Sequence, residues 1–71
     1  MAIVVDKRIE LTGGGETAVG QHHFVSFEQP GGEHFELEVP AAEFGLLVAG
    51  DRGSVTMKGT QYLAFARELM R

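Results

Sequence analysis

The stretch QHHFVSFEQPGGEHFELEV, residues 21–39, decides the fold. Two runs of alternating apolar and polar residues flank Pro30-Gly31-Gly32, and a three-residue connection ending in glycine is typical of a β-hairpin whose turn closes with a bulge. If Gln29 lies opposite Glu33, the large apolar side chains gather on one face, with the pairs Phe27–Phe35, Val25–Leu37 and His23–Val39. The pattern therefore predicts a hairpin that buries its odd-numbered residues from Val25 to Val39.

The residues before this hairpin predict a first strand over Ala2–Leu11, because β-branched and charged residues alternate there. The apolar positions of this alternation are Ile3, Val5, Ile9 and Leu11. Lys7 falls on the same parity, which indicates a bulge or twist near Asp6-Lys7. The glycine-rich segment 12–20 predicts a surface loop.

The residues after the hairpin predict a short helix and two more strands. Pro40 to Val48 has a proline suited to a first helical turn and an apolar stripe formed by Phe44, Leu47 and Val48. Residues 50–53, GDRG, predict a turn. The strands expected next are Ser54 to Lys58, with Val55 and Met57 inward, and Gln61 to Ala66, with Leu63 and Phe65 on one face and Tyr62 on the other.

The expected order of elements is strand, strand, strand, short helix, strand, strand. This order predicts an all-β fold for residues 1–71 as a single domain, a small five-stranded OB-like barrel with one short helix between the third and fourth strands. An SH3-like barrel is the alternative. Phe27, Phe35, Leu37 and Phe65 are the expected centre of its core.

Three segments resemble a known family: HHFVSFE (22–28), FELEV (35–39) and EFGLLVAGDRGSVTMKGTQYLAF (43–65). They are similar to a bacterial family of small domains catalogued as domain of unknown function number 2500, and the likeness spans about residues 3–66. The resemblance implies an OB-like barrel and no established activity. It also implies that many relatives carry a membrane-spanning segment ahead of the barrel.

Charge and composition limit the partners that the chain can be expected to bind. The net charge is −4, and the six Lys and Arg residues do not cluster, so nucleic acid is an unlikely partner. The chain has no stretch of about 20 apolar residues and hence no membrane segment of its own. We therefore expect a cytoplasmic protein if the chain is full-length, and a membrane-associated one if it comes from an anchored protein.

The residue types that catalysis and metal binding need are sparse. There is no cysteine, and no serine lies near a histidine and an acid in a triad-like pattern. His34 lies near the Pro30 turn of the predicted hairpin, whereas His22 and His23 lie at its far end. The rise of a strand puts them roughly 16–20 Å apart. The sequence therefore predicts no enzyme, no metal site and no cofactor.

The outward aromatic Phe24 is the one residue that suggests a binding face. The face of the second and third strands binds ligands in OB barrels, often through aromatic platforms. The candidate binding face comprises Phe24, Glu36, Glu38 and Tyr62. We interpret it as a surface for protein interaction or assembly, with a protein partner or a homo-oligomer. The alternative is binding of a single-stranded nucleic acid or an oligosaccharide.

Overall fold

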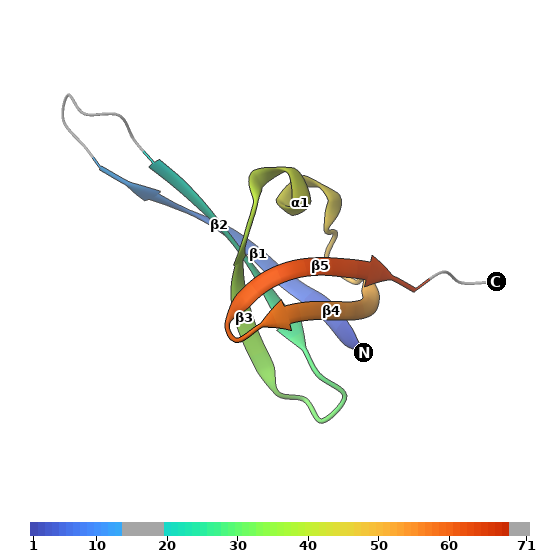
Figure 1. The fold of residues 1–71 in the computed structure, drawn as a ribbon. Helices are drawn as coiled ribbons and strands as arrows, with labels where there is room; N and C mark the ends of the chain where they lie inside the picture. Colours follow the sequence, from blue (N-terminus) through green and yellow to red (C-terminus); the bar gives the residue numbers. More distant parts are fainter. Residues whose placement is uncertain (14–19, 69–71) are drawn as a thin grey trace.

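The computed structural model describes residues 1–13 and 20–68, so most of the predicted loop 12–20 lies outside the described residues. Five antiparallel strands form one sheet in the order β3-β2-β1-β4-β5 (Figure 1). The elements are β1 Ala2–Thr12, β2 Gly20–Glu28, β3 His34–Val39, α1 Ala41–Leu46, β4 Arg52–Lys58 and β5 Gln61–Arg67. The prediction of an all-β chain with five strands and a short helix between the third and fourth is confirmed.

The β2–β3 hairpin has the predicted register. Its pairs are His23–Val39, Phe24–Glu38, Val25–Leu37, Ser26–Glu36, Phe27–Phe35 and Glu28–His34. Gly32 closes the turn with a φ of 91°, and its N–H donates to the carbonyl of Gln29 at 2.8 Å. Glycine suits this position because other residues rarely adopt a positive φ. The odd-numbered residues point into the core as predicted, and Phe35 among them is only half-buried.

A bulge in β1 reverses the predicted inward parity of its first half. Val4 pairs with Phe27 and Asp6 with Ser26, so Val5 is the extra residue. The buried residues are therefore Ala2 and Val4, where the sequence predicted Ile3 and Val5. A bulge near Asp6-Lys7 was predicted, and the structure places it at Val5, directly before that pair.

A second bulge, in β5, corrects the prediction for Tyr62. Thr56 pairs with Ala64 and Met57 with Tyr62, so Leu63 is the extra residue. Tyr62 points inward and is 6% exposed, whereas Leu63 is 51% exposed. The predicted faces of these two residues are thus exchanged. Met57, predicted to be inward, is also exposed.

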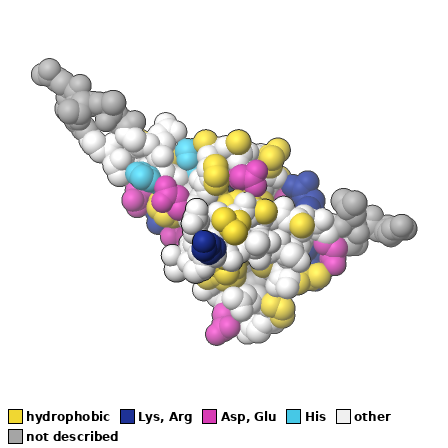
Figure 2. All heavy atoms as spheres, viewed as in Figure 1, with side chains coloured by type: hydrophobic (Ala, Val, Ile, Leu, Met, Phe, Trp, Pro, Cys, Tyr) yellow, Lys and Arg dark blue, Asp and Glu magenta, His cyan; other side chains and the backbone are white. Residues whose placement is uncertain are grey.

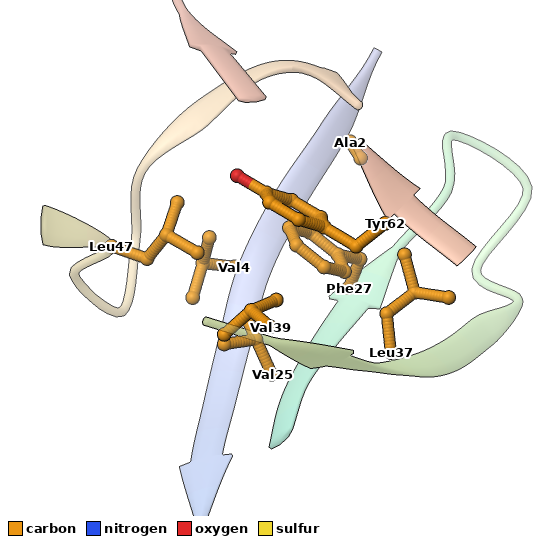
Figure 3. Close-up of a cluster of buried hydrophobic side chains, with 8 residues drawn as sticks. All are labelled: Ala2, Val4, Val25, Phe27, Leu37, Val39, Leu47 and Tyr62. Atoms are coloured by element: carbon orange, nitrogen blue, oxygen red, sulfur yellow. The ribbon is translucent and has the colours of Figure 1, made fainter. Parts of the chain in front are cut away.

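The core lies on the inner face of the curved sheet. Its buried side chains are Ala2, Val4, Val25, Phe27, Leu37, Val39, Leu47 and Tyr62 (Figure 3). Phe27 is fully buried, with its ring centroid 5.4 Å from that of Phe35 and 5.9 Å from that of Phe65. Phe35, Phe44, Val55 and Phe65 pack around this cluster while remaining partly exposed.

The helix is shorter than predicted because Leu47 leaves it. Leu47 has extended backbone angles, φ −89° and ψ 126°, and its side chain enters the core, whereas Val48 is exposed. A turn follows in which the Asp51 N–H donates to the Val48 carbonyl. The Asp51 carboxylate accepts hydrogen bonds from the Val48 N–H and from Arg67. Both bonds lower the pKa of Asp51, and the bond from Val48 has the larger effect. The turn therefore spans residues 48–51, two residues earlier than the predicted GDRG turn, and Arg52 and Gly53 belong to β4.

The sheet curls without closing through hydrogen bonds. β3 and β5 are its two end strands, and a cleft of about 370 Å³ lies between them, lined by Glu38, Val39, Pro40, Thr60, Gln61 and Tyr62. The outer halves of β1 and β2 continue past the rest of the sheet (Figure 1). We call this end of the β1–β2 ribbon, residues 8–12 with 20–24, the arm; β3 reaches only its base, where it pairs with His23 and Phe24. In the described ranges, no helix has the length and apolar character needed to cross a membrane.

Candidate functional site

The structure brings together three of the four residues of the predicted binding face. Phe24, Glu36 and Glu38 share the outer face of the β2–β3 hairpin, where Phe24 pairs with Glu38. Tyr62 does not belong to this face, because the β5 bulge turns its side chain into the core. The predicted aromatic platform of Phe24 with Tyr62 is therefore not formed. Binding by the remaining three residues stays a prediction.

Arg8 covers the Phe24 ring. The guanidinium carbon lies 4.3 Å from the ring centroid, a cation–π contact. Arg8 also donates two hydrogen bonds to Glu36, at 2.8 and 2.9 Å, and one to Glu10 at 3.0 Å. The Glu36 bonds are the main cause of a raised pKa for Arg8, and Arg8 in turn lowers the pKa of Glu36. A base or sugar could stack on Phe24 only after Arg8 had moved away.

The sequence prediction missed Arg8, although a signal was present. Arg8 lies directly opposite Phe24 once the first two strands are paired. Cross-strand neighbours on one face have Cβ atoms about 4.5–5.5 Å apart, so a long cationic side chain opposite an aromatic one is expected to cover it. The register of β1 against β2 was needed to see this pairing.

The three histidines are separated, as the hairpin predicted. His22 Nδ1 lies 2.6 Å from Glu38, His34 Nε2 lies 2.9 Å from Glu28, and the His23 ring packs against Phe44 at 4.9 Å. Histidine and acidic side chains lie beside one another where the arm leaves the sheet (Figure 2). In the described part of the chain, no three His, Cys, Asp or Glu residues gather as metal ligands would.

The inner face of the arm presents apolar side chains that the core does not cover. Ile9 is 51% exposed and Leu11 is 63% exposed. Both side chains point to the same face of the sheet as Lys7 and Val25. The Lys7 ammonium on this face lies 4.3 Å from the Phe44 ring centroid. The sequence predicted Ile9 and Leu11 to be inward. They are on the inner face, but they lie beyond the place where the core ends, and so they remain in solvent.

Tyr62 and Glu43 join β5 to α1. The Tyr62 hydroxyl donates to Glu43 Oε1 at 2.8 Å, from a ring that lies among the core side chains (Figure 3). Burial, followed by the interaction with Glu43, raises the pKa of the Tyr62 phenol well above its ordinary value of 10.0. This contact is structural, because the ring is buried and its hydroxyl is already bonded.

We expect the Tyr62 phenol to stay protonated in the folded protein at pH values where a free phenol ionises. Because the folded pKa is raised, the stabilisation is complete below pH 10 and is lost as the pH rises towards the folded pKa. The chain has one Tyr and no Trp, so phenolate absorbance reports this group alone. Urea-unfolded protein should titrate near the ordinary value, and a native protein that does the same would contradict the buried contact. Glu43→Gln should move the native titration down.

The comparisons with known proteins agree with this architecture. The model of a family described as "Protein of unknown function (DUF2500)" matches residues 1–66. A crystal structure of a DUF2500 protein from Klebsiella pneumoniae, a structural genomics target, is similar with a TM-score of 0.81 and 25% sequence identity. The alignment covers 97% of this chain and 93% of that one. No curated protein matches the sequence. The predicted resemblance is therefore confirmed.

Proposed function

The chain belongs to the DUF2500 family, and we propose that it is a non-enzymatic module for protein interaction or assembly, which binds through the inner face of its arm. The single observation that supports this proposal most is the exposure of Ile9 and Leu11, at 51% and 63%. They lie on the arm, beyond the last buried residues of β1 and β2. A two-stranded ribbon is marginally stable by itself in water, and a contact over its apolar face would stabilise it.

The polar groups around the core favour binding over catalysis. The described side chains of Tyr62, Glu43, Asp51 and Arg67 are engaged with one another or with backbone. Among the described residues, every buried side-chain nitrogen or oxygen has a hydrogen-bond partner. A reactive group held ready for a substrate would instead present an accessible donor or acceptor in a pocket.

The fold itself supports an OB-like description. OB-folds are five-stranded, partly open barrels, and here the sheet curls but leaves a cleft between β3 and β5. The ligand face of such barrels would include Phe24. Because Arg8 lies on that ring and is held by Glu36, we favour a protein partner on the arm over a nucleic acid or an oligosaccharide on Phe24.

A photo-crosslinking amino acid introduced at Leu11 tests this function in living cells. We expect ultraviolet light to attach the chain covalently to protein through position 11, giving discrete heavier species. The matched control is the same amino acid at Leu63, which is also a half-exposed leucine on a strand but lies on β5. Equal crosslinking at the two positions, or none at position 11, would contradict a binding role for the arm.

A further inference from the structure

One long edge of β1 has no partner strand among the described residues. β4 pairs with β1 only at Ala2 and Ile3, and the loop before β4 adds two backbone hydrogen bonds at Val4. Beyond the Val5 bulge, β2 pairs with one edge of β1 as far as Thr12. Within residues 1–13 and 20–68, no strand pairs with the other side of β1 over residues 6–12, and we call this side the free edge. Such an edge is a ready template for a further strand.

The backbone groups that face this free edge belong to the odd-numbered residues. The Lys7 N–H donates to the Asp6 carboxylate at 2.9 Å, which places it on the open side of the strand. Residues alternate between facing the neighbouring strand and facing away from it in an antiparallel ladder. Ile9 and Leu11 therefore present their N–H and C=O groups to the free edge together with Lys7.

The side chains along this edge of one copy are complementary in charge to those of a second copy that runs antiparallel to it. If two copies of β1 run antiparallel with Ile9 opposite Ile9, each Arg8 lies opposite a Glu10 of the other copy. The remaining pairs are Lys7–Leu11 and Asp6–Thr12, and each occurs twice. Opposite charges in facing positions stabilise a sheet, and Lys7 can lay its aliphatic stem along Leu11.

The neighbouring symmetric registers are less favourable. Centring the two strands on Arg8 or on Glu10 places like charges directly opposite each other, which destabilises strand pairing. Centring them on Lys7 places Asp6 opposite Arg8 but opposes two ammonium groups at the centre, whereas the register centred on Ile9 has its two ion pairs without any like charges facing each other. Centring them on Leu11 leaves Glu10 opposite Thr12 and forms no ion pair. The register centred on Ile9 is thus selected by charge.

We propose that the partner of the arm is a second copy of this chain, joined edge to edge through β1 in the register centred on Ile9. This inference rests on the proposed function and identifies its partner. The contact is isologous, as in most symmetric dimers, and joins β3-β2-β1 of one copy to β1-β2-β3 of the other, with β4 and β5 of each copy attached at the inner end of β1. Six backbone hydrogen bonds form, two at each of the three facing pairs of odd-numbered residues. In two of them the Lys7 N–H exchanges the Asp6 carboxylate for the Leu11 carbonyl of the other copy. Ile9 of each copy contacts Ile9 of the other, and Leu11 contacts the aliphatic part of Lys7, so both apolar side chains lose part of their exposed surface.

Single-cysteine variants test the register directly, because the chain contains no cysteine. In a hydrogen-bonded pair the facing Cα atoms lie about 5.5 Å apart, within the range that a disulfide spans. We expect Ile9→Cys to form a disulfide-linked dimer under mild oxidation. Leu11→Cys should run as a monomer in non-reducing electrophoresis, since residue 11 of one copy would lie roughly 13 Å from residue 11 of the other. Equal linkage at both positions would overturn the proposed register.

Charge reversal tests the same contact without a covalent link. Sedimentation equilibrium of the whole chain should show a reversible dimer, weakened about tenfold or more by Glu10→Arg. An equimolar mixture of Glu10→Arg with Arg8→Glu should associate again. Glu33→Arg, which reverses an exposed acid in the β2–β3 turn, should leave association unchanged.

The failure of this inference can be told apart from the failure of the proposed function. A wild-type chain that is monomeric at every concentration overturns the second copy as partner. If position 11 nevertheless crosslinks to a different protein in cells, the arm remains a binding surface. If the wild-type chain is monomeric and position 11 crosslinks to no protein, both proposals are overturned.

Discussion

Phe27→Ala is expected to unfold most of the protein at room temperature. Phe27 has no exposed surface and stacks with Phe35 and near Phe65, so its truncation leaves a cavity where β2, β3 and β5 meet. Replacing a buried Phe with Ala costs about 3–5 kcal/mol. A domain of this size without disulfides rarely has more than about 3–5 kcal/mol of stability in total. Circular dichroism and urea titration should show a largely unfolded variant.

The control for this experiment is Phe24→Ala, three residues earlier on the same strand. Phe24 is half-buried on the opposite face, and its ring contacts the Arg8 guanidinium. We expect its truncation to cost about 1 kcal/mol. Phe27→Leu, with an expected cost of roughly 1–2 kcal/mol, keeps the test measurable if the alanine variant cannot be purified. A larger loss from Phe24→Ala than from Phe27→Ala would mean that the inner face has been assigned to the wrong side chains.

The β2–β3 hairpin was predictable because two independent signals agree in it. The Pro30-Gly31-Gly32 turn sets the register, and the alternation of apolar residues sets the buried face. β1 and β5 lack this agreement. At each bulge an apolar residue follows another, Val5 after Val4 and Leu63 after Tyr62, so either parity looks suitable for the core. Which one is buried depends on pairing with strands distant in the sequence.

The candidate site was harder to predict, because its residues depend on where the core ends. Ile9 and Leu11 have the apolar character of core residues, and only the length by which β1 and β2 pass α1 and β3 shows that they are exposed. Arg8 has the character of an ordinary surface charge until Phe24 and Glu36 are placed beside it. Sequence periodicity gives the face of a residue, whereas its exposure is a property of the assembled sheet.

Gly53→Ala is the second change expected to have a large effect. Gly53 is buried where β4 pairs with both β1 and β5, opposite Ala2 and Arg67. A Cβ atom at this position would lie 2.1 Å from the backbone carbonyl oxygen of Ala66 and 2.9 Å from the Phe65 ring. Backbone cannot rotate away as a side chain can, so β4 and β5 would have to separate by about 1 Å. We expect a loss of roughly 2–4 kcal/mol, from overpacking and from weakened ladder hydrogen bonds.

The same substitution elsewhere in the chain should have the opposite sign. Gly45 lies in α1, is exposed, and has nothing within 4 Å of the position that a Cβ would take. Gly45→Ala should therefore stabilise the protein by about 0.5–1 kcal/mol, because alanine loses less conformational entropy in a helix. Paired urea titrations of the two variants separate the steric effect from the general effect of adding a methyl group. If Gly53→Ala melts at or above the wild-type temperature, then β4 and β5 do not approach as closely at Ala66 as the packing described here requires.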